Sequence, residues 1–231
     1  MIREQLSRAL LATERQMRVE LERAARGHMR DLFIAMGESS PGPATLYRSV
    51  ARQSRAFEAD ARGAILAGRG RARDASLLLV SALFAGASLG AMNEVDNARA
   101  ELAARGLAQS FAGIAAGTFG AWLLSGKPAP ALAIPQALRR FPSSVERTAS
   151  TENSNAFNGA LREVSGANLN ARLVEWEWDA ALDRRTCSVC RDMHGVVTEG
   201  GSFRGGLWPG SVHPRCRCLA YPLMNRWRSA A

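Results

Sequence analysis

Several residue types are scarce in this chain of 231 residues, and each shortage excludes some classes of protein. Lysine occurs once, at Lys127, so the formal net charge of +9 depends almost entirely on arginine. Aromatic residues make up only 6% of the chain, whereas hydrophobic residues, many of them alanine, make up 47%. This composition indicates a folded protein that favours helix over strand. The length allows one large domain or two smaller ones.

Signatures of several enzyme and targeting classes are also missing. The sequence contains no glycine-rich phosphate loop and no H-E-x-x-H. The N-terminal segment mixes charged and apolar residues from its first turn, so it lacks the uninterrupted apolar stretch of a signal peptide. The four cysteines are confined to one short segment, which does not resemble the framework of a secreted disulfide-rich protein. We therefore expect a non-enzymatic protein made in a reducing compartment.

Helical patterns dominate the first 142 residues, which we expect to be mainly α with long amphipathic helices. One helix is predicted from Ile2 to Met36, because apolar residues recur there at helical intervals. These residues are Leu6, Leu10, Met17, Leu21, Ala25, Met29 and Leu32. A second helix is predicted over 45–66, and the glycine- and arginine-rich segment 67–74 predicts a loop after it.

Positive charge is concentrated towards both ends of the chain. Residues 1–73 contain 14 basic and 8 acidic residues, and residues 139–231 contain 13 and 9. Such a balance favours polyanions such as DNA, RNA or an acidic membrane surface, although a solvated surface explains it equally well. Four arginines close together are the candidate nucleic-acid contacts: Arg62, Arg69, Arg71 and Arg73.

Two segments in the middle of the chain contain no charged residue. They cover residues 75–93 and 106–126, and each is close to the length of a bilayer-spanning helix. Each also contains a G-x-x-x-G pair, Gly86 with Gly90 and Gly113 with Gly117, which permits close helix packing. Because alanine, glycine and serine supply much of both segments, buried helices of a water-soluble assembly are the favoured interpretation. Membrane insertion, including transient insertion, is the alternative.

The last third of the chain predicts a small α+β domain. Four prolines between Lys127 and Ser144 indicate a linker, so we divide the chain into residues 1–142 and 143–231. A helix is predicted over 144–164 and a strand over 173–178, with Val174, Trp176 and Trp178 on one face of that strand. Short apolar segments follow at 196–198 and 219–223.

All four cysteines lie in this domain with two of the three histidines. Cys187 and Cys190 form a C-x-x-C pair, and an H-x-x-C-x-C motif follows about 20 residues later. Two such turns supply the four nitrogen or sulfur ligands of a tetrahedral zinc ion. The five candidate ligands are Cys187, Cys190, His213, Cys216 and Cys218. We expect the first four to bind the ion, with Cys218 as the substitute for either His213 or Cys216. A full set of protein ligands would make this zinc ion structural.

Other interpretations of the cysteines stay open. Four cysteines also permit two disulfides, and a C-x-x-C pair can be redox-active, although the strand and helix of a thioredoxin-like site are missing. His194 could support a nuclease or transferase, but a turn histidine is the simpler reading. Asp183 is expected to accept a hydrogen bond from the cysteine turn.

These residues resemble the C-terminal module of the phage Mu F-like minor head proteins, which the SPP1-type head morphogenesis proteins share. The resemblance is carried by the helix after Arg147, by the tryptophan strand, by the C-x-x-C pair and by "HPRCRC" from His213 to Cys218. Matching positions are Arg147, Thr148, Glu152, Trp178, Asp183, Cys187, Cys190, Asp192, Gly195, His213, Pro214, Cys216, Arg217 and Cys218. Ala149 and Ser150 interrupt the usual Arg-Thr-Glu sequence of the helix, and the loop before His213 is unusually rich in glycine.

The resemblance implies a structural virion component of a tailed phage, made in the host cytoplasm and taken into the head near the portal during capsid assembly. The implied partners are the portal and other head proteins, with packaged DNA as a non-specific partner and further copies of the chain in an oligomer. The alternative is an internal protein that is ejected with the DNA and whose uncharged helices form or anchor a channel in the host envelope.

Overall fold

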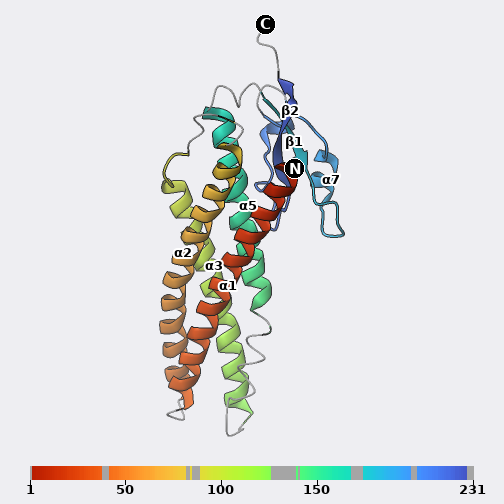
Figure 1. Cartoon of the computed structure of the whole chain (residues 1–231). Helices are drawn as coiled ribbons and strands as arrows, with labels where there is room; N and C mark the ends of the chain where they lie inside the picture. Colours follow the sequence, from red (N-terminus) through yellow and green to blue (C-terminus); the bar gives the residue numbers. More distant parts are fainter. Residues whose placement is uncertain are drawn as a thin grey trace. The chain divides into compact units, whose positions relative to one another are not determined.

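A computed structural model describes residues 2–37, 42–81, 84, 89–125, 139, 141–167, 174–198 and 202–227. The long helices are α1 (Ile2–Gly37), α2 (Pro43–Ser81), α3 (Glu94–Leu124) and α5 (Pro142–Ala167). The short elements are β1 (Val174–Asp179), α7 (Ser188–Met193), η2 (Arg204–Gly206) and β2 (Leu219–Trp227) (Figure 1). The predicted class, a mainly α N-terminal region with a small α+β C-terminal part, is confirmed.

The chain forms two compact units that alternate along the sequence. Unit 1 comprises residues 1–16, 67–93 and 150–231, and unit 2 comprises residues 17–66 and 94–149. Helices α1, α2 and α5 each contribute one segment to unit 1 and another to unit 2. The division at residues 142 and 143 stays a prediction about the sequence, since the compact units are composed differently.

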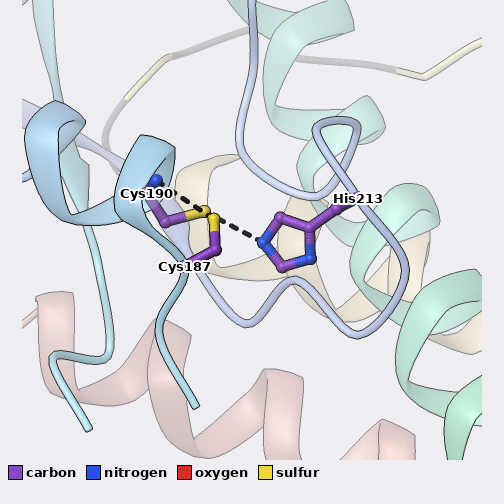
Figure 2. Close-up of side chains that lie close together, drawn as sticks. All are labelled: Cys187, Cys190 and His213. Atoms are coloured by element: carbon purple, nitrogen blue, oxygen red, sulfur yellow. Dashed lines mark hydrogen bonds between the residues drawn. The ribbon is translucent and has the colours of Figure 1, made fainter. Parts of the chain in front are cut away.

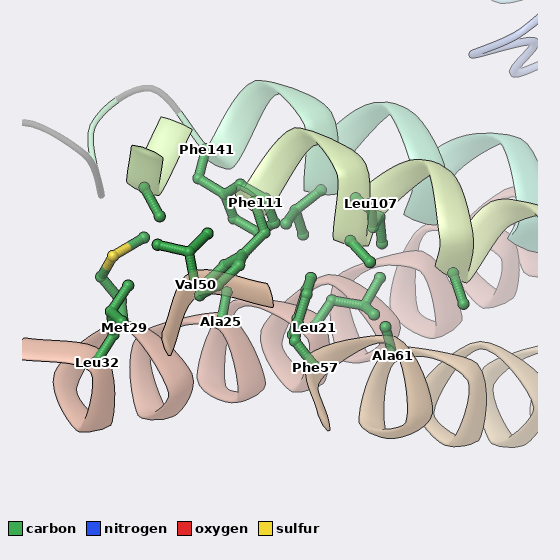
Figure 3. Packing of buried hydrophobic residues seen from close by; sticks show 14 of the residues in the cluster. Leu21, Ala25, Met29, Leu32, Val50, Phe57, Ala61, Leu107, Phe111 and Phe141 are labelled. Carbon is green, nitrogen blue, oxygen red and sulfur yellow. The ribbon is translucent and has the colours of Figure 1, made fainter. Parts of the chain in front are cut away.

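Unit 2 is a helical body with a core of small and aromatic side chains. The apolar stripe predicted for α1 is buried here, with Leu21, Ala25 and Met29 at most 2% exposed (Figure 3). Phe57 of α2 packs against Phe111 of α3, with ring centroids 5.1 Å apart. Many alanines in this core allow the helices to approach closely, which explains how so few aromatic residues suffice.

Helix α3 contains most of the second uncharged segment, but it starts earlier than predicted. The helix begins at Glu94 and includes charged residues such as Arg105, which lies 3.8 Å from Glu58. Phe111, Ala115 and Phe119 are fully buried in the core of unit 2. Among the described helices, none combines the length and the hydrophobicity that crossing a bilayer requires.

Helix α2 corrects two sequence predictions. The loop predicted at 67–74 is wrong, because α2 continues through this segment to Ser81. The uncharged helix predicted over 75–93 is confirmed as far as Ser81 and is wrong at its end, since residues 89–93 are irregular. In this irregular segment the amide of Gly90 donates to Glu163 at 2.6 Å, and its carbonyl accepts from Arg73 at 3.0 Å.

Tertiary pairing explains why α2 tolerates its glycines and arginines. Arg69 is 2% exposed and donates to Glu152 of α5 at 2.6 Å, while Arg73 donates to Glu163 of the same helix at 2.8 Å. A helical glycine costs about 1 kcal/mol, a penalty that such packing can override. Two of the four candidate DNA-contacting arginines are thus held by carboxylates of unit 1.

Strand β1 is the centre of the C-terminal part of unit 1. It pairs antiparallel with β2, with Trp178 opposite Ala220, and its other edge bonds to residues 195–198. Trp176 and Trp178 are both fully buried, as their alternation predicts. Trp178 packs edge-on against Phe203, with ring centroids 5.3 Å apart. The predicted helix over 144–164 and the predicted strand over 173–178 are confirmed by α5 and β1.

Some sequence predictions fall on parts of the chain that the structure does not describe. The proline-rich linker is predicted for residues 127–144. Of these, residues 127–138 and residue 140 lie outside the described part of the chain. Gly86 of the first G-x-x-x-G pair also lies outside them.

Candidate metal centre

Helix α7 places the first two candidate ligands. Cys187 caps the N-terminus of this helix in an extended conformation, and its sulfur accepts the amide of Cys190 at 3.3 Å. Cys190 lies in the first turn and is 1% exposed. A C-x-x-C pair that spans the start of a helix turns both sulfur atoms to the same side, as the sequence spacing predicts.

The loop before β2 brings His213 to this pair. His213 Nε2 lies 3.2 Å from Cys190 Sγ, and Figure 2 shows Cys187, Cys190 and His213 turned towards one another. The other ring nitrogen, Nδ1, lies 2.7 Å from the carbonyl oxygen of Pro214. Because a carbonyl only accepts, Nδ1 carries the proton and the lone pair of Nε2 faces the sulfur atoms.

Cys216 and Cys218 complete the cluster from the other side of Cys190. Cys190 Sγ and Cys216 Sγ are 3.8 Å apart. The ligand atoms of Cys187, Cys190 and His213 lie within 4.8 Å of one another, and so do those of Cys190, Cys216 and Cys218. The structure thus brings together all five predicted residues around Cys190. All four cysteines are free thiols, with no disulfide between them.

The spacing of these atoms fits a tetrahedral ion. Zinc–sulfur bonds of about 2.3 Å place two sulfur atoms of a tetrahedron about 3.8 Å apart, which is the separation of Cys190 and Cys216. Thiols and a neutral imidazole are also the ligand types that zinc binds in structural sites. The residues present therefore fit a zinc ion, and no carboxylate is needed to complete the set.

The surroundings of the three buried thiols shift their pKa values in different directions. A hydrogen bond from Cys218 is the main cause that lowers the pKa of Cys216 to about 5, and the amide of Gly210 adds to it at 3.3 Å. The same bond, with burial, raises the pKa of Cys218 above its ordinary value. Burial, followed by the charge on Cys216, raises the pKa of Cys190 to about 12. Of the three buried thiols, Cys216 therefore ionises most readily, whereas Cys190 and Cys218 resist ionisation.

Asp183 accepts hydrogen bonds from the chain on both sides of the cysteine cluster. Its carboxylate accepts the amide of Arg185 at 2.9 Å and the guanidinium of Arg217 at 2.6 Å. Arg217 stands between Cys216 and Cys218, so this ion pair joins the segment before the first turn to the second. The hydrogen bond from Arg217 is the main cause that lowers the pKa of Asp183.

Helix α5 supports the second turn through residues that the sequence did not single out. Asn158 donates to the carbonyl of Cys218 at 3.1 Å and accepts the amide of Ala220 at 3.2 Å. Thr151 accepts the amide of Arg215 at 3.0 Å. Arg215 has a φ of +62°, a left-handed conformation that is uncommon for a residue other than glycine. Polar residues in the middle of a helix were the only signal that could have identified these contacts.

Gly210 brings the same loop against α5. It has a φ of +85°, and a Cβ at this position would lie 2.7 Å from the carbonyl oxygen of Ser154. Only glycine permits so close an approach of the loop to the helix backbone. Since the Gly210 amide also donates to Cys216, the contact positions a donor for the cluster.

The remaining predicted site residues lie elsewhere. His194 accepts the amide of Ala180 at 3.1 Å through Nδ1 and lies 3.7 Å from Asp179, next to β1. It is therefore held more firmly than a free turn histidine. Arg62 is exposed in unit 2, and Arg71 is partly buried in unit 1. DNA contact by the four arginines stays a prediction.

Comparison with known proteins agrees with the resemblance drawn from the sequence. Residues 132–221, 90 of the 231 residues, match the model of the family described as phage Mu protein F like protein. The matched range includes α5, β1, α7 and all five candidate ligands. Neither a curated protein nor a solved structure matches the chain. The recognition of a Mu F-like module is confirmed over this part of the chain, and it suggests a phage head morphogenesis protein.

Proposed function

We propose that this chain is a minor head protein of a tailed phage, with a C-terminal module that a structural zinc ion holds together. The observation that carries the proposal is the convergence of three other thiols and one imidazole on Cys190, inside the segment that matches the family. The family match supports a place in the virion. Zinc, the portal and an oligomeric state are our proposals.

The proposed role of the zinc ion is to fix the conformation of a thin domain. Two named strands and a six-residue helix supply little regular structure between Val174 and Trp227. An ion bound by Cys187, Cys190, His213 and Cys216 would connect α7 to the loop before β2, two segments about 25 residues apart. Because structural zinc binds far more tightly to the folded state, its binding free energy contributes directly to folding.

We also propose that the chain is not an enzyme. A full set of protein ligands leaves no coordination position open for substrate or activated water. His194 Nδ1 is engaged by the amide of Ala180, which supports a structural role. Purified protein is expected to show no nuclease activity, and any cleavage that His194→Ala abolishes would contradict this part of the proposal.

The zinc proposal is tested by metal analysis of the purified full-length chain. We expect one zinc ion per chain, and Cys190→Ser should lose the ion because Cys190 lies in both ligand groups. Ser188→Ala is the matched control, since it changes a neighbour in α7 that is no candidate ligand. Full zinc content in Cys190→Ser, or no metal in the parent protein, would refute the zinc proposal.

The assembly proposal is tested separately by imaging intact particles. A tag at the N-terminus of the chain should appear at the portal vertex in a few copies per particle. Particles without the chain, or a tag distributed evenly over the capsid, would contradict the proposed location. The proposed partners are the portal, other head proteins and further copies of the chain.

A further inference from the structure

We propose that one face of α1 in unit 2 is a binding site for the phosphate backbone of nucleic acid. A groove of about 440 Å³ lies there, and the described residues that line it are Val19, Arg23, Arg26, Gly27 and Arg30. This arginine groove involves none of the four arginines singled out from the sequence. The inference deepens the proposed function by assigning a site to packaged DNA.

The three arginines point from a narrow part of the helix surface. At 100° per residue, the five lining residues fall within an arc of about 100°. The opposite face carries the buried residues Leu21, Ala25 and Met29, so the arginine face is directed away from the core of unit 2. Between Arg23 and Arg30 the sequence contains no acidic residue.

Neighbouring carboxylates do not occupy these guanidinium groups firmly. Arg26 donates to Glu22 at 2.9 Å with its side chain 65% exposed, and Arg30 lies 3.8 Å from Asp31 with its side chain 75% exposed. Exposed ion pairs of this kind contribute about 0–1 kcal/mol each. A phosphate, whose oxygens accept two parallel hydrogen bonds from a guanidinium, can replace them.

Gly27 is the second feature that indicates a ligand. In the middle of a 36-residue helix, glycine costs about 1 kcal/mol relative to alanine. A Cβ at this position would meet no atom of the described residues within 4 Å, so the packing of those residues does not require glycine here. Its effect is to leave the helix backbone open between the arginines, which lets a ligand approach closely.

The dimensions of the groove fit a nucleic-acid strand. From Arg23 to Arg30 the helix rises about 10 Å, at 1.5 Å per residue. One strand of B-DNA presents a phosphate about every 3.4 Å of axis, so about three phosphates face three arginines. Backbone contacts carry no base sequence, and we expect binding without sequence preference.

The test measures binding of a short mixed-sequence DNA duplex to the zinc-loaded full-length chain by fluorescence anisotropy. The triple variant Arg23→Gln/Arg26→Gln/Arg30→Gln removes up to three phosphate contacts, which should reduce the salt dependence of log K by about 2.7. Between about 50 and 200 mM salt, the parent protein should therefore lose about 40-fold more affinity than the variant. The control is Arg48→Gln/Arg52→Gln/Arg55→Gln, three exposed arginines at similar helical spacing on α2.

A second variant separates the groove from its charge. Gly27→Leu keeps every arginine and fills open space, so the fold should be retained and DNA affinity should fall several-fold. Equal losses in both triple variants, or unchanged binding in Gly27→Leu, would overturn the proposal. The proposal would also be overturned if poly-glutamate bound as tightly as DNA and its affinity depended in the same way on Arg23, Arg26 and Arg30. A failure here would leave the zinc content and the position in the particle unchanged.

Discussion

Gly210→Ala tests how the second cysteine turn is held against α5. The added Cβ would lie 2.7 Å from the carbonyl oxygen of Ser154, whereas ordinary contacts begin near 3.4 Å. The loop and the helix would have to separate by several tenths of an ångström, which costs about 1–3 kcal/mol as overpacking. The left-handed φ of +85° adds about 1 kcal/mol for alanine. We expect the free energy of unfolding to fall by about 2–4 kcal/mol.

Gly195→Ala is the matched control for this prediction. Gly195 has a φ of +79°, but a Cβ there would meet nothing within 4 Å in the part of the chain that the structure describes. It should therefore lose only the conformational part, about 1 kcal/mol. Urea denaturation followed by tryptophan fluorescence gives both values, with zinc at a fixed concentration because bound metal raises the apparent stability.

The two glycine variants should also differ in metal affinity. Displacing Gly210 moves the amide that donates to Cys216 Sγ, and loss of such supporting contacts weakens metal binding by about tenfold or more. Gly195→Ala should leave the zinc affinity unchanged. Equal losses of stability in both variants would refute the role assigned to the contact between Gly210 and Ser154.

Two further predictions concern buried charge and the protons of the cluster. Arg69→Met should destabilise unit 1 by about 3 kcal/mol, because it removes a partner of the buried carboxylate of Glu152. The double variant Arg69→Met/Glu152→Leu should lose clearly less free energy of unfolding than the two single variants added together. Additive losses in a denaturant series would contradict this prediction. Zinc binding at pH 7 should release the proton of Cys190, whose pKa is about 12, and none from Cys216, whose pKa is about 5. The zinc affinity should therefore rise with pH near neutrality. It should fall steeply as the pH drops through about 5, where Cys216 also becomes protonated. Calorimetry of the parent protein in buffers of different ionisation enthalpy counts the released protons, and a count of zero at pH 7 would contradict the pKa assigned to Cys190.

Local patterns predicted α1, α5 and β1, and they singled out the cysteine and histidine residues that the structure brings together. The apolar stripe of α1 and the alternation around Trp176 and Trp178 depend only on the period of helix and strand, and both side-chain sets are buried. The two cysteine turns depend on short spacings that a single turn satisfies. Their convergence from segments about 25 residues apart could be expected only because the ligand types suit one ion.

Predictions failed where a distant partner determines the conformation of a segment. Glycine and arginine at 67–74 predict a loop by propensity, yet Glu152 and Glu163 of α5, about 80 and 90 residues away, pair with Arg69 and Arg73. The irregular segment at 89–93 is likewise held by a distant residue, because the amide of Gly90 donates to Glu163. No window of local sequence contains both members of these pairs.

The sequence by itself determined the helical character of the first 142 residues, the β1 strand, the five candidate ligands and the resemblance to the Mu F-like module, because these depend on spacing within a few turns of chain. Only the tertiary structure decided which arginines are buried, that Cys190 is shared by both ligand groups, and that Gly210 must approach Ser154. The arginine groove of α1 also emerged only there, since the burial of its opposite face identifies which side of the helix remains exposed. Long-range contacts fix these features, and their free energies depend on burial and distance rather than on residue order.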